Sequence, residues 1–308
     1  YERFLAAADA SPFEKRLAKS YVEGFNAARA ELISASAIAQ TDQAAAEIEG
    51  QKQFRLRAGY KALVDWLARD LPSESLRLQT EIREIRWQKG RAQVAANTTA
   101  GEGVFVAARV IVTVPLGVLR APPGSRGAIQ FFPALSQKEE AMRHLEMGHV
   151  TKLLIGFKKR FWEAAEPFAF AISLDADMPA WWTQEPLTSN VLTGWSGGSL
   201  AEKLINLSRT DLIDRALGSL SQLFGHPKNL LREYIDTVHY YDWSNDPFSK
   251  GAYSYPKVGG LEAARILAEP VDETIFFAGE AIDFEGFGTV HGAINSGASA
   301  AERVARSL

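Results

Sequence analysis

The chain has 308 residues, a formal net charge of -3 and no cysteine, and these values exclude several functional classes. A nearly balanced charge gives no electrostatic basis for binding nucleic acid or an anionic membrane surface. Without cysteine there is no disulfide, thiolate metal ligand or cysteine nucleophile, and the five histidines show no metal-ligand spacing. No apolar run approaches the ~20 residues of a membrane span, and no export signal is visible, so we expect a cytoplasmic protein.

The first quarter of the chain is predicted to be helical. SPFE at Ser11–Glu14 is a capping box with proline at the first helical position. Phe13, Leu17, Tyr21 and Phe25 then follow at intervals of four residues, which predicts the buried face of a helix.

Short runs of strand-forming residues begin after Pro72. EIREIRW, RAQVAAN and GVFVAARVIVTVP are separated by glycines, which predicts strands joined by tight turns. Within the last run, VIVTV is typical of a strand buried on both faces of a sheet. HVTKLLIGFKKRFW predicts another strand, and helices follow it. The alternation of helices and strands indicates a mixed α/β (α+β) fold with two discontinuous domains.

The C-terminal segment FFAGEAIDFEGFGTVHGAINSG predicts a strand, a glycine-rich turn and a helix. Its glycines are spaced GxGxxxG rather than GxGxxG, and too few residues follow for the ~30-residue βαβ unit of a dinucleotide site. The spacing alone favours a structural turn whose glycines relieve crowding. However, Glu280 lies just past the end of a buried parallel strand, where α/β proteins bind ligands. The helix start also offers N–H groups to an electron-rich oxygen.

This segment resembles the C-terminal signature of the flavin-dependent amine oxidases, a family that includes monoamine oxidases, polyamine oxidases and histone lysine demethylases. Four further stretches match in order, from about Phe54 onward: FRLRAGYKALVDWLA, VIVTVPLGVL, HVTKLLIGFKKRFW and YDWSNDPFSKGAYSYP. The resemblance implies FAD as cofactor. The cofactor is expected to be non-covalent, because Ala252 lies in the region of the cysteine that carries the flavin in monoamine oxidases.

The resemblance also implies a partial, discontinuous FAD-binding domain and a substrate domain of mixed sheet and helices. We expect the helical part of the substrate domain at 1–57, an FAD-domain segment at 58–118, the rest of the substrate domain at 119–238 and a C-terminal FAD-domain segment at 239–308. The family's GxGxxG lies near its N-terminus and has no counterpart in this chain. We therefore expect a fragment, or a separate polypeptide that supplies the missing N-terminal FAD-binding segment. The other expected partners are a small-molecule amine and oxygen.

The resemblance assigns residues to the cofactor and the substrate. The residues expected to contact FAD are Thr113, Pro115, Trp243, Gly251, Ala252, Tyr253, Gly279, Glu280, Thr289, Val290 and His291. Trp243, Tyr253 and Phe287 are expected to form apolar walls around the substrate. Gly286 stands where amine oxidases often carry an aromatic cage residue, so the cage and the precise substrate stay open.

Several of these assignments have structural alternatives. Glu280 is also consistent with a helix-capping or solvated carboxylate, His291 with a packed structural histidine, and the aromatic segment near Trp243 with a core loop. Lys152 lies among apolar residues of a predicted strand. One explanation is that the strand is at the edge of a sheet and that the lysine prevents aggregation. The resemblance favours a catalytic lysine that holds a water near flavin N5.

The expected reaction is hydride transfer from the α C–H of a neutral amine to flavin N5, followed by imine hydrolysis and reoxidation by oxygen, with release of hydrogen peroxide. Two alternatives keep the fold: an amino-acid oxidase, favoured by an arginine facing the cavity, and a desaturase, favoured by a long apolar tunnel. A third is a non-catalytic folded fragment that binds no flavin.

Overall fold

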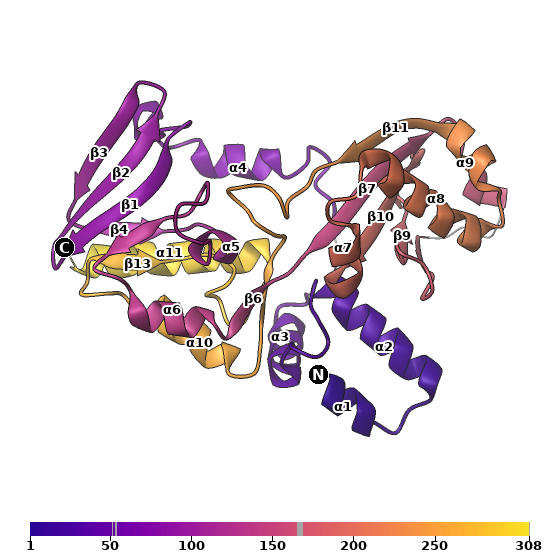
Figure 1. Ribbon diagram of the computed structural model, residues 1–308, viewed down its shortest axis with the longest axis horizontal. Coiled ribbons are helices and arrows are strands. Elements are labelled where there is room, and N and C mark those ends of the chain that lie inside the picture. The colour runs from indigo at the N-terminus through magenta and orange to yellow at the C-terminus, as the bar shows by residue number, and fades with distance from the viewer. Residues whose placement is uncertain (51, 53, 165–168, 308) are drawn as a thin grey trace.

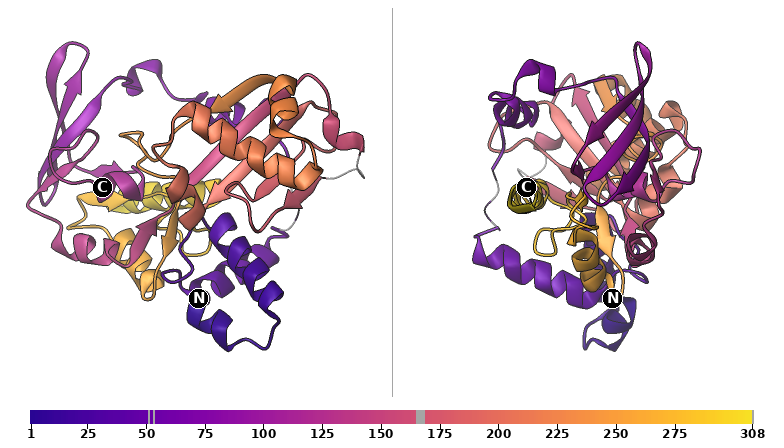
Figure 2. Two further views of the ribbon diagram at one scale, coloured as in Figure 1. Left: turned by 45° about the vertical axis from the view of Figure 1, so that its right-hand side comes forward. Right: turned by 90° about the vertical axis from the view of Figure 1, so that its left-hand side faces the viewer.

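The computed structural model describes residues 1–50, 52, 54–164 and 169–307. Two groups of strands lie side by side, and the N-terminal helices lie beneath the place where they meet (Figures 1 and 2). The mixed α/β fold predicted from the sequence is confirmed. In the described part of the chain, no helix is both long enough and apolar enough to cross a membrane.

The N-terminal helices are α1 (Glu2–Ala7), α2 (Pro12–Phe25) and α3 (Ala35–Glu47). The predicted capping box starts α2: the Ser11 amide donates to the Glu14 carboxylate at 2.7 Å, and the Glu14 amide donates to the Ser11 hydroxyl at 3.3 Å. The predicted buried face is wrong. Its four side chains are between 38% and 64% exposed, because α2 packs on the rest of the molecule through Val22 and its last turn.

A four-stranded sheet has the order β3-β2-β1-β5 and appears at the left of Figure 1. Its first three strands form an antiparallel meander, as predicted, and the last pairs parallel with β1. Gly90, with φ of 76°, turns the chain between the first two strands. The bounds are β1 (Glu81–Gln88), β2 (Arg91–Thr98), β3 (Gly101–Ala107) and β5 (Gln130–Phe132).

Two short strands, β4 (Val110–Val112) and β13 (Ile275–Phe277), form a parallel pair beside this sheet. The next element after β13 in the chain is α11 (Val290–Ser307). Val112 is buried, but Ile111 on the opposite face is 36% exposed. The prediction that this strand is buried on both faces is therefore wrong. Since the two strands are parallel, their carboxyl ends meet at one edge of the pair.

The second sheet has the order β11-β7-β10-β9-β8, and every neighbouring pair is antiparallel. One face packs on α8 to form a core that contains Leu153, Ile155 and Trp181. The opposite face carries the alternate residues. The bounds are β7 (Val150–Phe157), β8 (Phe170–Ile172), β9 (Ala180–Trp182), β10 (Val191–Gly197), β11 (Ile235–Tyr240), α7 (Gly198–Leu204), α8 (Arg209–Phe224) and α9 (Lys228–Tyr234).

The antiparallel pair β6 (Leu145–Met147) and β12 (Ser254–Pro256) lies between the two sheets. A hydrophobic core that includes Leu145 joins β1, β4 and β13 to three of the remaining helices. Apolar residues between Ile129 and Met147 pack in this core, whereas those from Leu153 onward pack in the core under α8. This division favours a crossing between domains near Gly148. The domain bounds expected from the sequence stay predictions. The remaining helices are α4 (Lys61–Ala68), α5 (Leu116–Leu119), α6 (Ser136–Met142) and α10 (Gly260–Ala268), with short 3-10 helices at Ser73–Ser75 and Phe161–Ala164.

Candidate functional site

The carboxyl edge of the parallel pair brings together residues that are far apart in the sequence. Phe277 pairs with Val112, and the Ala278 amide donates to the Val112 carbonyl at 3.0 Å. Thr113 and Gly279 therefore leave neighbouring strands at the same edge. Thr113 is exposed, and a Cβ built on Gly279, where φ is 146°, meets nothing within 4 Å. Open space thus adjoins the edge at which parallel sheets bind ligands.

Glu280 uses its carboxylate to hold two other backbone segments in place. It accepts hydrogen bonds from the Ser254 hydroxyl at 2.7 Å, from the Ser254 amide at 3.2 Å and from the Gly288 amide at 3.1 Å. Burial raises the pKa of Glu280, and these hydrogen bonds oppose the shift. The described contacts make Glu280 a brace between β12 and the turn before α11, while its predicted contact with FAD stays a prediction.

The glycine turn before α11 is shaped by crowding, as its spacing predicts. A Cβ on Gly292 falls 2.3 Å from the Gly286 carbonyl oxygen, so only glycine fits there. Thr289 closes the turn by donating to the Gly286 carbonyl at 2.7 Å and accepting from the Gly292 amide at 3.1 Å. Val290 and His291 then occupy the first helical turn, whose N–H groups have no partner inside the helix. Both side chains are exposed, so His291 is not the packed histidine of the structural alternative.

The aromatic segment from Tyr241 to Tyr253 wraps around the entry to β7. The Ala252 amide donates to the Gly148 carbonyl, and the Gly148 amide donates to the Tyr253 carbonyl, each at 2.8 Å. Gly251 is required at its position, because φ is 148° and a Cβ there falls 2.4 Å from Met147 Cγ. The glycine lets this backbone lie directly against β6.

The two predicted aromatic residues in this segment have different surroundings. Trp243 is 49% exposed, and its ring centroid lies 4.5 Å from that of Tyr241. The Tyr253 hydroxyl donates to the Phe25 carbonyl oxygen at 2.5 Å, and burial raises its pKa far above the ordinary value. Tyr253 therefore ties this segment to the end of α2.

Lys152 projects from the face of β7 that α8 does not cover, directly opposite Trp195 of β10. Because β7 lies between β11 and β10, the edge-strand explanation is wrong. Burial and the nearby guanidinium of Arg55 both lower the pKa of Lys152. Lys152 follows Gly148 by four residues, which is about 13 Å at ~3.3 Å per strand residue. It thus lies near the aromatic segment but in a separate part of the site.

Two of the predicted site residues are packed against the protein and do not face open space. Phe287 is 8% exposed and packs in the first hydrophobic core, so we do not retain it as a wall of the substrate site. Pro115 is partly buried and precedes α5, where its carbonyl accepts from the Val118 amide at 2.9 Å. The sequence reasoning missed Arg55, Trp182 and Trp195. The only signal for the two tryptophans is their alternation along strands, which does not say which strands pair.

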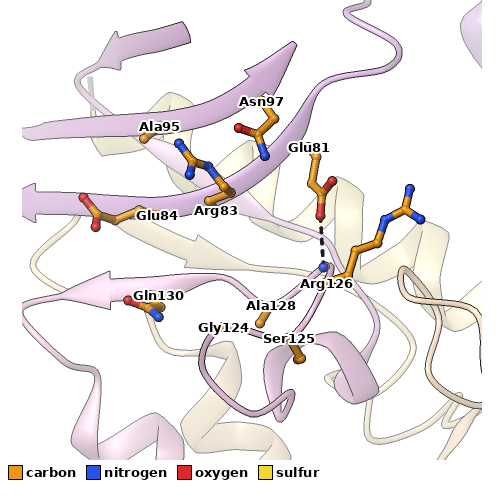
Figure 3. A pocket seen from close by; sticks show the side chains of 11 residues that line it. Glu81, Arg83, Glu84, Ala95, Asn97, Gly124, Ser125, Arg126, Ala128 and Gln130 are labelled. Atoms are coloured by element: carbon orange, nitrogen blue, oxygen red, sulfur yellow. Dashed lines mark hydrogen bonds between the residues drawn. The ribbon is translucent and has the colours of Figure 1, made fainter. Parts of the chain in front are cut away.

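A separate hollow of about 610 Å³ lies between β1, β2 and the loop at 124–128 (Figure 3). None of the predicted site residues lines it. Glu81 accepts from the Gly127 amide at 3.1 Å, and Arg83 pairs with Glu102 at 2.8 Å. These charges are satisfied by the protein, and they give no reason to place the chemistry here.

The donor set at the carboxyl edge of β4 and β13 fits one side of a flavin. It combines first-turn N–H groups, an exposed Thr113 and the open space beside Gly279. The fold and this edge place the chain among the α/β proteins, a class in which ligands bind at the carboxyl ends of parallel strands.

Comparison with known proteins identifies the family. Residues 3–305 match the family described as flavin containing amine oxidoreductase. The chain is 32% identical over 269 residues to lysine-specific histone demethylase 1B of Mus musculus, a match that covers 81% of this chain and 30% of that protein. It is 32% identical over 249 residues to polyamine oxidase 3 of Oryza sativa subsp. japonica, covering 79% and 48%. The chain belongs to the flavin-containing amine oxidoreductases, and FAD is the cofactor that this membership implies.

Solved structures agree on the fold. A putrescine oxidase variant with redesigned cofactor binding has a TM-score of 0.82 at 21% identity and covers 99% of this chain and 67% of its own. Cyclohexylamine oxidase from Brevibacterium oxydans has a TM-score of 0.79 at 20% identity, with the same coverage. The chain spans about a third to a half of the length of the curated relatives given above.

Proposed function

We propose that this chain is part of an FAD-dependent enzyme that oxidises an amine, and that it supplies one side of the flavin site together with the substrate-facing sheet. The family match supports the reaction class. The observation that supports the assignment to this site is the position of Lys152, an exposed side chain on the face of an interior strand that α8 does not cover. When bound, FAD supplies the hydride acceptor that turns the amine into an imine, and oxygen is the final oxidant, reduced to hydrogen peroxide.

Each residue of the site has a specific task in this proposal. Lys152, with three N–H donors, holds the water that hydrolyses the imine on the open face of the sheet. The first-turn amides of Val290 and His291 stabilise negative charge on a bound ring oxygen. Glu280 keeps this turn at a set distance from β12 through its bonds to Ser254 and Gly288.

A further part of the proposal concerns the segment that binds the cofactor pyrophosphate. No GxGxxG occurs in the 308 residues, and parallel sheets are normally covered on both faces. Ile111 of β4 is exposed, and α4 carries Val64, Trp66 and Leu67 as exposed apolar side chains with no buried residue. Figures 1 and 2 show α4 standing apart from the neighbouring elements. We propose that a segment with the pyrophosphate-binding loop packs between β4 and α4.

Amino-acid oxidation is a second candidate, because Arg55 lies close enough to Lys152 to lower its pKa. Its guanidinium donates to the Thr183 and Glu185 carbonyls, each at 3.3 Å. The remaining N–H groups of Arg55 are suited to a carboxylate.

The test is anaerobic mixing of flavin-loaded protein with primary amines and with amino acids. We expect amines to bleach the visible flavin absorbance and oxygen to restore it, with one hydrogen peroxide formed per amine. Bleaching by amino acids alone supports the second candidate. Protein that binds no FAD when the segment with the pyrophosphate-binding loop is present, or flavin-loaded protein that keeps its absorbance with every substrate, contradicts the proposal and leaves the non-catalytic alternative.

A further inference from the structure

We propose that Phe170, Trp182 and Trp195 form the subsite for the organic part of the substrate, and that Arg55 and Lys152 restrict this subsite to amines with a single ammonium group. We call the three aromatic residues the aromatic track. The proposal rests on the proposed function, because it names the substrate class of the same site.

The strand register places the aromatic track on one face of the sheet. Trp195 pairs with Lys152 across β10 and β7, and Phe170 pairs with Trp182 across β8 and β9. Trp182 also pairs with Thr193, two residues from Trp195 on the same side of β10. The track thus starts at Lys152 and crosses four neighbouring strands.

The rings are in mutual contact but are incompletely covered. The Trp182 and Trp195 centroids are 5.9 Å apart with a 48° interplanar angle, and those of Phe170 and Trp182 are 6.4 Å apart and nearly stacked. Trp181, on the opposite face, is fully buried under α8, whereas Phe170 is 56% exposed. Since contiguous exposed aromatic surface is costly in water, an apolar ligand is stabilised here.

The inner end of the track is held beside the cofactor-side residues. Trp195 Nε1 donates to the Gly24 carbonyl at 2.8 Å, and the Tyr253 hydroxyl donates to the next carbonyl, that of Phe25, at 2.5 Å. Two consecutive carbonyls at the end of α2 therefore position both side chains. A ring that is already oriented loses little conformational freedom on binding, which favours affinity.

The charges beside the track select against a second ammonium. Arg55 and Lys152 are both cationic, and no carboxylate of the described residues forms an ion pair with either of them. A diamine that lies along the track brings its second charge toward Arg55, whose guanidinium donates to the Thr183 carbonyl directly after Trp182, and the aromatic faces compensate for only part of that repulsion. A monoamine with an aromatic or bulky aliphatic group meets no such penalty.

Binding can be measured without turnover, by titrating the change in tryptophan fluorescence of the flavin-loaded protein. The probes are 2-phenylethylamine, methylamine, 1,4-diaminobutane and phenylalanine. We expect 2-phenylethylamine to bind at least tenfold more tightly than 1,4-diaminobutane. Trp182→Leu is expected to weaken 2-phenylethylamine about tenfold and to leave methylamine unchanged, and Trp182→Phe to restore most of the affinity.

Phe132→Leu is the matched control, because it removes a 40%-exposed aromatic ring from the other sheet; it is expected to change no affinity. Arg55→Gln is expected to reduce the ratio of the affinities for 2-phenylethylamine and 1,4-diaminobutane about tenfold. Arg55→Lys is expected to preserve this ratio. The proposal is overturned if wild-type protein binds the diamine as tightly as the monoamine, or if Trp182→Leu weakens nothing. Tighter binding of phenylalanine that Arg55→Gln abolishes also overturns it, by assigning Arg55 to a carboxylate.

Flavin bleaching in the same samples separates the two proposals. Selective binding that depends on the track, without bleaching, contradicts the amine oxidase function and supports the subsite. Bleaching at a rate that is the same for wild type and Trp182→Leu with 2-phenylethylamine contradicts the subsite and supports the function.

Discussion

Ser254 and Glu280, 26 residues apart in the sequence, are joined by hydrogen bonds from both the amide and the hydroxyl of the serine to the carboxylate. Glu280 also accepts from the Gly288 amide. One side chain therefore sets the distance between β12, which follows the aromatic segment, and the turn that starts α11. Four testable predictions follow from contacts of this kind.

The first concerns the stability of this junction. Ser254→Ala removes a donor to a partly buried carboxylate and is expected to cost about 1.5–3 kcal/mol at pH 7. The loss should be smaller at pH 4. Because burial raises the folded-state pKa of Glu280 above 4.5, folding takes up a proton in the window that starts near pH 4.5, so this group's contribution to stability falls as pH rises through that window. Loss of the Ser254 hydroxyl raises the pKa of Glu280 further, so the contribution of Glu280 to stability falls more as pH rises.

Urea denaturation at pH 4 and pH 7 measures this difference. Ser125→Ala is the control, because its exposed hydroxyl donates only to the Pro122 carbonyl in a loop. An equal loss for Ser254→Ala at the two pH values would show that the carboxylate does not depend on the serine.

The second prediction concerns the two glycines of α11. Gly292→Ala places a Cβ 2.3 Å from the Gly286 carbonyl oxygen, which forces a backbone shift and is expected to cost about 1–3 kcal/mol. Gly297→Ala is the matched control in the same helix, since nothing lies within 4 Å of its Cβ. It is expected to stabilise the protein by about 0.5–1 kcal/mol, because alanine loses less entropy on forming a helix. Thermal melts measure the change in stability of both variants. Similar changes in the two would refute the crowding argument.

The third prediction concerns Lys152. Lys152→Met is expected to lower the rate of amine oxidation about 10²-fold, the lower end of what a positioned proton-transfer group contributes. Flavin content should be unchanged, because Lys152 lies on the substrate sheet and not at the β4–β13 edge. The steady-state rate at which the carbonyl product of imine hydrolysis appears, and the flavin absorbance of the purified variant, measure the two quantities.

Lys158→Met provides the comparison for Lys152, since Lys158 directly follows the same strand and donates to the Glu233 carbonyl at 2.9 Å. It should retain wild-type rates. Loss of flavin from Lys152→Met would move this lysine to the cofactor side of the site.

The fourth prediction concerns Lys138, a buried lysine of α6 that caps α10. Its ammonium donates to the Ile266, Leu267 and Glu269 carbonyls. Lys138→Met leaves these carbonyls without that donor and is expected to cost about 3 kcal/mol. Chemical denaturation measures the loss. Lys89→Met, in an exposed turn, is expected to leave the unfolding midpoint unchanged; an equally small effect at Lys138 would remove the capping role.

Local patterns in the sequence were sufficient for the family, for the meander of β1 to β3 and for the capping box at Ser11. They were also sufficient for the crowded turn between Gly286 and Gly292. In each case the deciding interactions lie within a few residues of one another, or within a motif whose order along the chain is itself the signal. The physical cause is local: a capping side chain, a turn glycine and a short strand act on their immediate neighbours.

Tertiary structure alone decided which apolar faces are covered and which strands are neighbours. The spacing of Phe13 and Tyr21 shows that one side of α2 is apolar, but only the packing of α2 through its last turn shows that this side is exposed. Likewise, no pattern in the sequence pairs Lys152 with Trp195, because the register between strands depends on contacts made after the chain has folded. Burial and register are properties of two surfaces together, and a linear sequence specifies only one of those surfaces at a time.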